Sequence, residues 1–542
     1  MFDTPGVYIR EIPSGSRPIS GVATSNTAFV GVLPRGPVNR AVRITSPGDF
    51  ERVFGGLMAE SETSYAVRNY FLNGGSVAFV VRVTAGTAAS ATGGAAPLVV
   101  TAASPGNWGN SLRFGVAHAD GATDTFTLLV REYRGNQVVR EEAFLDVSTQ
   151  EGAPRYVQTV VARDSELVTV DHTAGSLPAR TSIDGTDATT LDALLDAQMN
   201  PSANLLEAPM GALTALAGGS AGILPDLTNP DANTDWIGAA EAAVVGSEDA
   251  GTGIHALNAI VPEVFNLLCL PDVATKTLAT DAGNVMRGIY QQAYAFCRRN
   301  NAFLLVDVPP GTDRSNIALW FTALGGAAGP NSALYYPRLS GGDPLDPLRP
   351  RVMQSSGFAA GIMARTDATR GVWKAPAGTE ARLLGGAPVD VMTDRQQGPL
   401  NTAGINAIRT FPVYNSVIWG ARTLDGADAR ASEWRYVNVR RLTLFIEASL
   451  QRGLQWVVFE PNDEPLWANV RLNVTAFMSQ LHRQGAFQGA SARDAFMVKC
   501  DGETTTQADI NLGILNVYVG FAPVRPAEFV LVRIQQRFAN AA

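Results

Sequence analysis

The residues that come nearest to a catalytic set are a serine turn, a histidine and an aspartate. Ser355–Ala360 is weakly similar to a turn that carries a serine nucleophile, and His255 and Asp307 are the types that serve as base and orienting group. A triad is defined by geometry, however, and nearly any chain of this length contains all three residue types. We therefore expect structural roles for these residues and a protein that is not an enzyme.

Neither the histidines nor the acidic and glycine-rich loops have the spacing of a metal or phosphate site. The chain has no HExxH, and the stretch from Asp226 to Asp235 lacks the ligand spacing of a calcium loop. Gly218–Ser220 and Gly341–Gly342 lack the Lys-Ser/Thr of a phosphate loop. The histidines, none at metal-ligand spacing from another, are His118, His172, His255 and His482. The sequence thus predicts no metal and no cofactor.

Charge and cysteine content narrow the class of protein. The chain carries 42 Lys and Arg against 50 Asp and Glu, a net charge of −8, which favours no nucleic-acid partner. Cys269, Cys297 and Cys500 are far apart and form no CxxC, which indicates reduced thiols in a cytoplasmic product. No stretch approaches the ~18 apolar residues of a membrane span, so we expect a soluble protein without direct membrane insertion.

Strand-like runs stand at both ends of the chain, in arms that we place at residues 1–25 and 523–542. The first run is followed by the linker-like stretch Ser14–Pro18, and the second follows Pro526. A lone short strand cannot form a core, so each run must join a sheet of its own subunit or of a neighbour. The predicted inter-subunit strand residues are Val7, Tyr8, Ile9, Arg10, Phe529, Val530, Leu531, Val532 and Ile534.

Between the arms the pattern predicts an α/β core in two parts, residues 26–90 and 236–349. Thr27–Val32 and Ala302–Val308 are continuous apolar runs, typical of strands buried on both faces of a sheet. Val285–Cys297 has one apolar helical face. Alternating helices and strands of this kind favour an α/β class.

An inserted, β-rich domain is expected between the two parts of the core, at residues 91–235. It begins after a stretch dominated by Ala, Gly, Ser and Thr. Two strand-like runs, Phe126–Tyr133 and Gln137–Val147, flank the turn residues Arg134–Asn136 and predict a hairpin.

The C-terminal part, residues 350–522, is the most clearly patterned. One helix is predicted around Leu442–Leu450, followed by a strand at Gln455–Phe459. Asn462 or Asp463 caps a second helix, with Pro465 in its first turn and Gly485 at its end.

Several motifs in one order resemble the tail sheath family of contractile phages and related injection systems. The most specific are Trp434–Leu442 and Val457–Trp467. Further motifs similar to the family are Pro5–Tyr8, Ser104–Asn110, Gly371–Gly378, Leu400–Asn401, Gly404–Asn406 and Val417–Leu424. They cover most of the chain and are weakest across about residues 120–250.

The resemblance implies a subtilisin-like sheath core that is not a protease, with an inserted β-rich domain, a C-terminal α/β sheath domain and terminal strand arms. It also implies stacked hexameric rings of this chain around an inner tube protein, with baseplate and terminator proteins as further partners. Such a subunit would assemble in the bacterial cytoplasm and become part of a phage tail or injection particle.

The resemblance further implies that the C-terminal domain faces the tube. The helix from Asp463 to Gln484 is the candidate, because core residues occupy one face and the other face is polar. Its predicted tube-facing residues are Arg471, Arg483 and Arg493, the last just beyond the helix. These arginines could equally be solvated or paired within the subunit.

Two other classes of protein remain as alternatives. One is a serine hydrolase built on the subtilisin-like core, which would react with a fluorophosphonate probe. The other is a different particle component, a shell or tube protein. Electron microscopy of the purified protein would distinguish it from a sheath.

Overall fold

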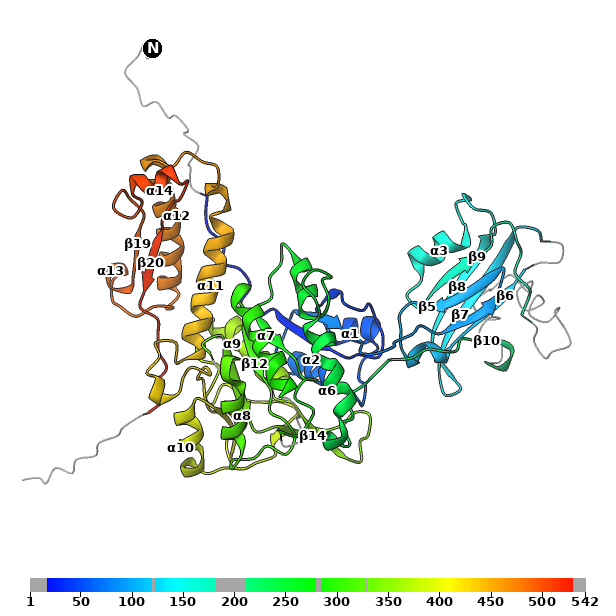
Figure 1. Cartoon of the computed structure of the whole chain (residues 1–542), viewed down its shortest axis with the longest axis horizontal. Helices are drawn as coiled ribbons and strands as arrows, with labels where there is room; N and C mark the ends of the chain where they lie inside the picture. The colour runs from blue at the N-terminus through cyan, green and yellow to red at the C-terminus, as the bar shows by residue number, and fades with distance from the viewer. Residues whose placement is uncertain (1–16, 119–121, 182–209, 279–283, 328, 530–542) are drawn as a thin grey trace, which may run out of the picture.

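An eight-stranded sheet forms the centre of the molecule (Figure 1). The computed structural model describes residues 17–118, 122–181, 210–278, 284–327 and 329–529. The strand order is β18-β17-β13-β12-β11-β1-β3-β2, in which the edge strands β18 and β2 run antiparallel to their neighbours and the other pairs are parallel. The strands are β18 (Asn415–Ile418), β17 (Asn406–Phe411), β13 (Ser332–Tyr336), β12 (Phe303–Val306), β11 (Leu267–Cys269), β1 (Thr27–Gly31), β3 (Ala78–Arg82) and β2 (Ala41–Ile44).

Both faces of this sheet are covered by helices, so its central strands are apolar throughout. In β12, Leu304 and Val306 join one core cluster, and Phe303 and Leu305 join the other. Alternate side chains of a strand point to opposite faces, which explains the continuous apolar run. The first cluster is covered by α6 (Thr234–Ala240), α7 (Val285–Arg299), α8 (Ile317–Leu324) and α10 (Asp394–Ala403), and the second by α1 (Pro47–Phe54), α2 (Glu62–Leu72) and α9 (Ser356–Arg370). The predicted α/β class and these buried strands are confirmed.

Helices α2 and α9 lie unusually close together on that second face. A Cβ atom added at Gly357 would lie 2.4 Å from the carbonyl oxygen of Ala66, and one at Gly361 would lie 2.6 Å from that of Tyr70. The two glycines are therefore required by the close approach of the helix backbones.

The expected division at residue 350 runs through this core. Strand β17 pairs with β13, β18 extends the sheet further, and α9 packs on its face. A three-stranded sheet of β14 (Leu339–Gly342), β15 (Pro350–Met353) and β16 (Ala387–Pro388) also spans the boundary. The core therefore continues to about residue 424, where Leu424 is still fully buried in it.

The insertion is a β-sandwich with its own apolar core, which includes Phe114, Val130 and Phe144. The segment that leads from the main body into the insertion and the segment that leads back lie side by side. They are joined by the antiparallel bridges Ala85–Ile223 and Thr92–Ala217. The sandwich consists of the sheet β4 (Thr92–Ala95), β5 (Leu98–Ala102) and β9 (Val168–His172), the sheet β6 (Leu112–Ala117), β7 (Thr125–Arg134), β8 (Gln137–Ser148) and β10 (Thr214–Ala215), and helix α3 (Val157–Asp164). The predicted hairpin is the β7–β8 pair.

A smaller C-terminal unit stands on the side of the core opposite to the insertion (Figure 1). Helix α11 (Val437–Gly453) joins it to the body, since Val437 and Leu444 pack in the main core and Leu442 and Ile446 in the unit's own core. The unit also contains α12 (Glu464–Arg483), α13 (Ala492–Ala495), α14 (Gln507–Asn511) and the antiparallel pair β19 (Phe496–Lys499) and β20 (Tyr518–Phe521).

Helix α12 begins and ends as the sequence predicts, but the strand before it is wrong. Asp463 accepts a hydrogen bond from the Leu466 N–H, and Gly485 takes a positive φ of 86° after the helix. Gln455–Val457 is a single 3-10 turn, not a strand. Its apolar residues lie where the chain reverses between two helices, so no neighbouring strand is present to pair with them.

Candidate functional site

Two buried carboxylates lie just beyond the carboxyl ends of the parallel strands β11 and β12. Asp272 and Asp307 are both fully buried. This end of an open α/β sheet is where ligands usually bind, so these are the first groups to test for chemistry. Burial raises the pKa of Asp272 to about 7 and that of Asp307 to about 6.

The Asp307 carboxylate is hydrogen-bonded to the first residue of helix α9. One carboxylate oxygen accepts a hydrogen bond from the Ser356 hydroxyl at 2.6 Å, and the other accepts one from the Ser356 N–H at 2.9 Å. His255, the third member of the hypothetical triad, packs edge-on against the Phe296 ring at 5.2 Å on the other face of the sheet. The three residues form no triad, because the carboxylate holds the serine directly and the histidine belongs to a different layer.

The Asp272 carboxylate is hydrogen-bonded in the same way to the first residues of helix α2. Its oxygens accept hydrogen bonds from the Glu62 N–H at 2.7 Å and the Thr63 hydroxyl at 2.7 Å, and from the Val32 N–H at 2.8 Å. A carboxylate is favoured at a helix N-terminus by the unpaired N–H groups and the helix dipole. Both aspartates therefore join helices to the sheet rather than offering a free reactive group.

The remaining candidate groups are also structural. All the cysteines are buried and unpaired, and burial raises the pKa of Cys269 and Cys500. Asp226 accepts hydrogen bonds from the Thr228 hydroxyl and the Asn229 N–H within its own turn. In the described part of the chain, no His, Cys, Asp and Glu side chains gather in a group that could hold a metal. No described helix is both long and apolar enough to span a bilayer.

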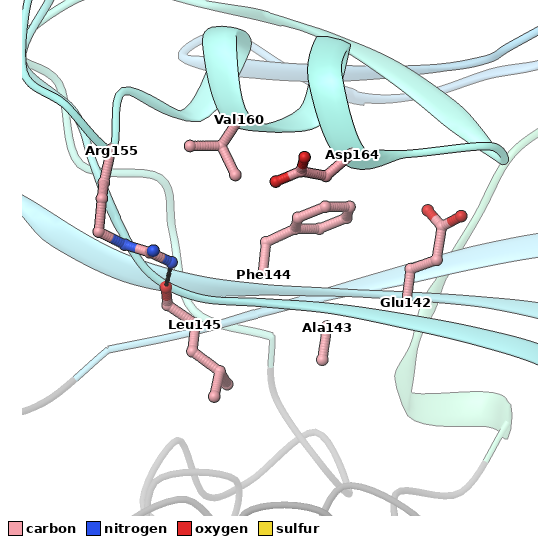
Figure 2. A pocket seen from close by; sticks show the side chains of 7 residues that line it. All are labelled: Glu142, Ala143, Phe144, Leu145, Arg155, Val160 and Asp164. Atoms are coloured by element: carbon pink, nitrogen blue, oxygen red, sulfur yellow. Dashed lines mark hydrogen bonds between the residues drawn. The ribbon is translucent and has the colours of Figure 1, made fainter.

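A pocket between β8 and α3 of the insertion carries two carboxylates, Glu142 and Asp164 (Figure 2). Glu142 accepts hydrogen bonds from the Ser165 hydroxyl at 2.5 Å and the Glu166 N–H at 2.9 Å. Asp164 pairs with Arg163 at 2.7 Å. The ring of Phe144 also lines the pocket (Figure 2). Because both acids already have hydrogen-bond or ion-pair partners, the pocket offers no free nucleophile or base.

The first described residues, 17–25, run along α11 and are held by the C-terminal unit. Ile19 is buried in the core of that unit, and the Arg17 guanidinium lies 4.8 Å from the centre of the Trp456 ring. The Val22 N–H donates to the Ser449 hydroxyl at 3.1 Å. The expected arm is thus bound to its own subunit from residue 17 onward, and the predicted strand residues Val7, Tyr8, Ile9 and Arg10 lie outside the described residues.

The last described residues, 522–529, pass from the C-terminal unit to the body. The carbonyl oxygen of Val524 accepts a hydrogen bond from the Asn438 amide at 3.0 Å, and Glu528 pairs with Arg422 at 2.6 Å. Phe529 follows with its side chain 80% exposed. The other predicted residues of this arm, Val530, Leu531, Val532 and Ile534, lie outside the described part of the chain.

The β19–β20 pair is the element best suited to accept added strands. Within the described residues it is a two-stranded sheet, and an isolated bridge between Phe487 and Pro523 lies just beyond the end of β20. Phe496, Val498, Val519 and Phe521 pack against the core of the C-terminal unit. A short exposed sheet with one packed face is a ready template for a further strand.

The predicted tube-facing arginines do not form one group. Arg471 pairs with Glu464 at 2.6 Å and donates a second hydrogen bond to the Cys500 carbonyl, so it braces α12 against β19. Arg483 and Arg493 are exposed, and neither has an ion-pair partner among the described residues.

Sequence reasoning missed the role of Arg422 and Glu528. The pair joins positions 106 residues apart, and the arginine is 1% exposed. The available signal was a single acidic residue standing directly before an apolar terminal run.

Comparison with known proteins identifies the C-terminal unit. Residues 430–537 match the phage tail sheath C-terminal domain. The chain is 29% identical over 191 residues to a prophage major tail sheath protein of Pseudomonas aeruginosa, and 26% identical over 185 residues to the tail sheath protein of Vibrio phage KVP40. These matches cover 34% of this chain, and 46% and 26% of the two relatives, so the chain matches less than half the length of either.

Solved structures match the whole chain. The sheath of an extracellular contractile injection system in its contracted state aligns with a TM-score of 0.55 and 22% identity, over 99% of this chain and 98% of that one. The contracted helical sheath of the anti-feeding prophage aligns with a TM-score of 0.53 and 24% identity, over 99% and 100% of the two chains. The fold is that of a contractile sheath subunit.

Proposed function

We propose that this chain, which carries a phage tail sheath C-terminal domain on a sheath fold, is the structural subunit of a contractile sheath. Many copies polymerise around an inner tube, and their contraction drives the tube through a target envelope. The observation that carries the proposal is the alignment with contracted sheath structures over 99% of the chain. The occupied carboxylates at the strand ends support a mechanical rather than an enzymatic role.

Contraction in this account needs no cofactor. Subunits assemble in an extended, metastable arrangement, and a trigger at the baseplate lets them repack into a shorter and wider one. The free energy comes from contacts between subunits that are better satisfied in the contracted state. Each subunit moves as a body, which its large buried core supports.

Links between subunits are proposed to be added β-strands. Residues 5–12 and 527–535 would pair with sheets of other subunits, and the β19–β20 pair is a suitable acceptor. Main-chain hydrogen bonds of this kind hold partners together while flexible linkers allow rotation. Subunits can then change their relative orientation without dissociating.

The insertion is proposed to lie on the outside of the cylinder and the C-terminal unit on the inside. The two stand on opposite sides of the core (Figure 1), so one faces outward when the other faces the tube. The insertion has its own core and contacts the body through polar groups such as the 2.9 Å Arg35–Glu132 pair. A biotin attached to Glu151→Cys should be accessible to streptavidin on intact cylinders, and accessibility only after dismantling would refute the placement.

Further partners follow from the same proposal. The chain would form stacked hexameric rings in the bacterial cytoplasm, ending at baseplate and terminator proteins in a phage tail or injection particle. Arg483 and Arg493 are the proposed contacts with an acidic tube surface. Nucleic acid and direct membrane insertion have no part in it.

Electron microscopy of the purified protein tests the proposal against its rivals. A sheath subunit forms long striated cylinders with a hollow wide enough for a tube. Closed shells would favour a capsid-like protein, and thin smooth rods a tube protein. Soluble monomers that react with a fluorophosphonate at Ser356 would favour a hydrolase.

A further inference from the structure

Arg422 sits at the junction of the body and the C-terminal segment. Its side chain is 1% exposed, and its N–H groups reach four separate parts of the chain. Nη1 donates to the carbonyls of Asn401 and Gly426 and to the Asp428 carboxylate, at 2.9 to 3.2 Å. The backbone N–H of Arg422 donates to the Asn406 side chain at 2.6 Å. The residue is thus held rigidly at the end of the main sheet.

The fourth partner of this guanidinium is Glu528, in a two-pronged contact. Nε donates to one carboxylate oxygen at 2.8 Å and Nη2 to the other at 2.6 Å. The Glu528 side chain is 15% exposed, so the pair is largely shielded from water. Parallel hydrogen bonds of this type fix direction as well as position.

The segment that carries Glu528 has few other ties. Residue 522 still bonds to the C-terminal unit, through the Ala522 N–H to the Ala495 carbonyl at 2.9 Å. Pro523 and Pro526 have no N–H to donate, which limits backbone bonding across this stretch. After the Val524–Asn438 bond, the Glu528 side chain is what joins the segment to the body.

The next residue points the other way. Successive side chains of an extended segment project to opposite sides, so Glu528 turns into the body and Phe529 turns out of it. Phe529 is 80% exposed, and it opens the apolar terminal run. Glu528 therefore binds its own subunit, whereas the side chain of the next residue, Phe529, is exposed to solvent.

We infer that the Arg422–Glu528 pair is the anchor of the C-terminal segment: it fixes the point and the direction in which the chain leaves the body, and so presents Phe529 to a neighbouring copy. This inference rests on the proposed function. A C-terminal segment that transmits force between subunits during contraction needs a fixed attachment to its own subunit. If the attachment were loose, the segment would extend instead of transmitting the force.

A spin label tests the anchor in the free subunit. The label is placed at Ala527→Cys, an exposed position beside Glu528, while the native cysteines are buried. Glu528→Gln keeps the shape of the side chain and removes its charge. Glu433→Gln is the matched control, because Glu433 is exposed in the nearby 425–436 stretch and has no ion-pair partner among the described residues.

In the electron paramagnetic resonance spectrum, we expect the label to be immobilised in the parent and in the control and to be highly mobile in Glu528→Gln. The circular dichroism spectrum should be the same for all three. In cells that produce the whole particle, Glu528→Gln should lower the yield of cylinders at least roughly tenfold, as for the loss of one partner of a buried pair. Equal spectra, or equal yields of cylinders, would overturn the anchor. A parent that forms no cylinders would instead refute the proposed function.

Discussion

Ser356 and Asp307 are joined twice, through the serine hydroxyl at 2.6 Å and the serine N–H at 2.9 Å, and both residues are fully enclosed. The bond ties the start of α9 to the end of β12. A pair that would attract attention as catalytic in a protease thus serves here to fasten a helix to the sheet.

The first prediction concerns this pair. Ser356 should not react with a fluorophosphonate, because it is buried and no histidine contacts it among the described residues. Ser356→Ala should lower the free energy of unfolding by about 1–3 kcal/mol, since it leaves a buried carboxylate with one bond fewer. Chemical denaturation measures the loss. Labelling of the wild-type serine would reverse the assignment.

The second prediction is a pH dependence of stability. Asp307 and Asp272 have folded pKa values of about 6 and about 7, above the usual value near 3.8, because burial disfavours their charged forms. The folded state therefore binds protons more tightly than the unfolded state. This stabilisation is fully present below the unfolded pKa, declines as pH rises above it, and is lost once the pH passes the folded pKa values of about 6 and about 7.

The measurement is the unfolding free energy from about pH 4 to about pH 8, for the wild type and for Asp307→Asn. In the variant the Ser356 hydroxyl can accept a bond from the amide, so the fold is retained. The slope of the decline below pH 6 should become about half as steep, while the decline between pH 6 and 7, which comes from Asp272, should remain. An unchanged profile would mean that Asp307 does not titrate in this range.

The third prediction separates folding from polymerisation at the N-terminal end. Deleting residues 1–16 should leave the thermal midpoint unchanged and abolish cylinders, because Ile19, which packs in the C-terminal unit, is retained. A deletion through residue 20 would also remove this core residue. Ile19→Ala alone should cost about 2–5 kcal/mol of stability. Normal cylinders from the shorter deletion would show that the N-terminal strand is not a link.

The fourth prediction concerns the tube. Arg483→Glu with Arg493→Glu should weaken assembly on the tube at low salt by about 1–2 kcal/mol, and added salt should reduce the difference. Arg395→Glu, on the exposed surface of α10, is the control. Arg471 is left unchanged, because reversing it would break its bonds to Glu464 and to Cys500 and confuse folding with binding. Co-assembly equal to the control would remove this end of α12 from the tube interface.

Local features of the fold were predictable from sequence, because they depend on neighbouring residues. The buried runs of β1 and β12 show as continuous apolar stretches, and the Asp463 cap with Pro465 marks the start of α12. Helix α6 (Thr234–Ala240) was not predicted from the sequence. It is short, and Trp236 and Ile237 are buried only because the main core covers them.

Non-local features were not predictable. The continuation of the core beyond residue 350 depends on β17 pairing with β13, some 70 residues earlier in the chain. The contacts of the candidate residues are equally distant, as Arg471 shows with the Cys500 carbonyl 29 residues on. Sequence suggested which residues were charged and exposed, and only the structure showed which of them already had partners.

The property that defines a contractile sheath is that it shortens without losing subunits. The most direct test is cryo-electron microscopy of whole particles, in a preparation that contains both fired and unfired ones, with the helical rise, diameter and subunit number measured for each. We expect two cylinders built from this chain, one long and narrow and one short and wide, with the same number of subunits. A single cylinder of invariant length, or a change in length accompanied by loss of subunits, would contradict it.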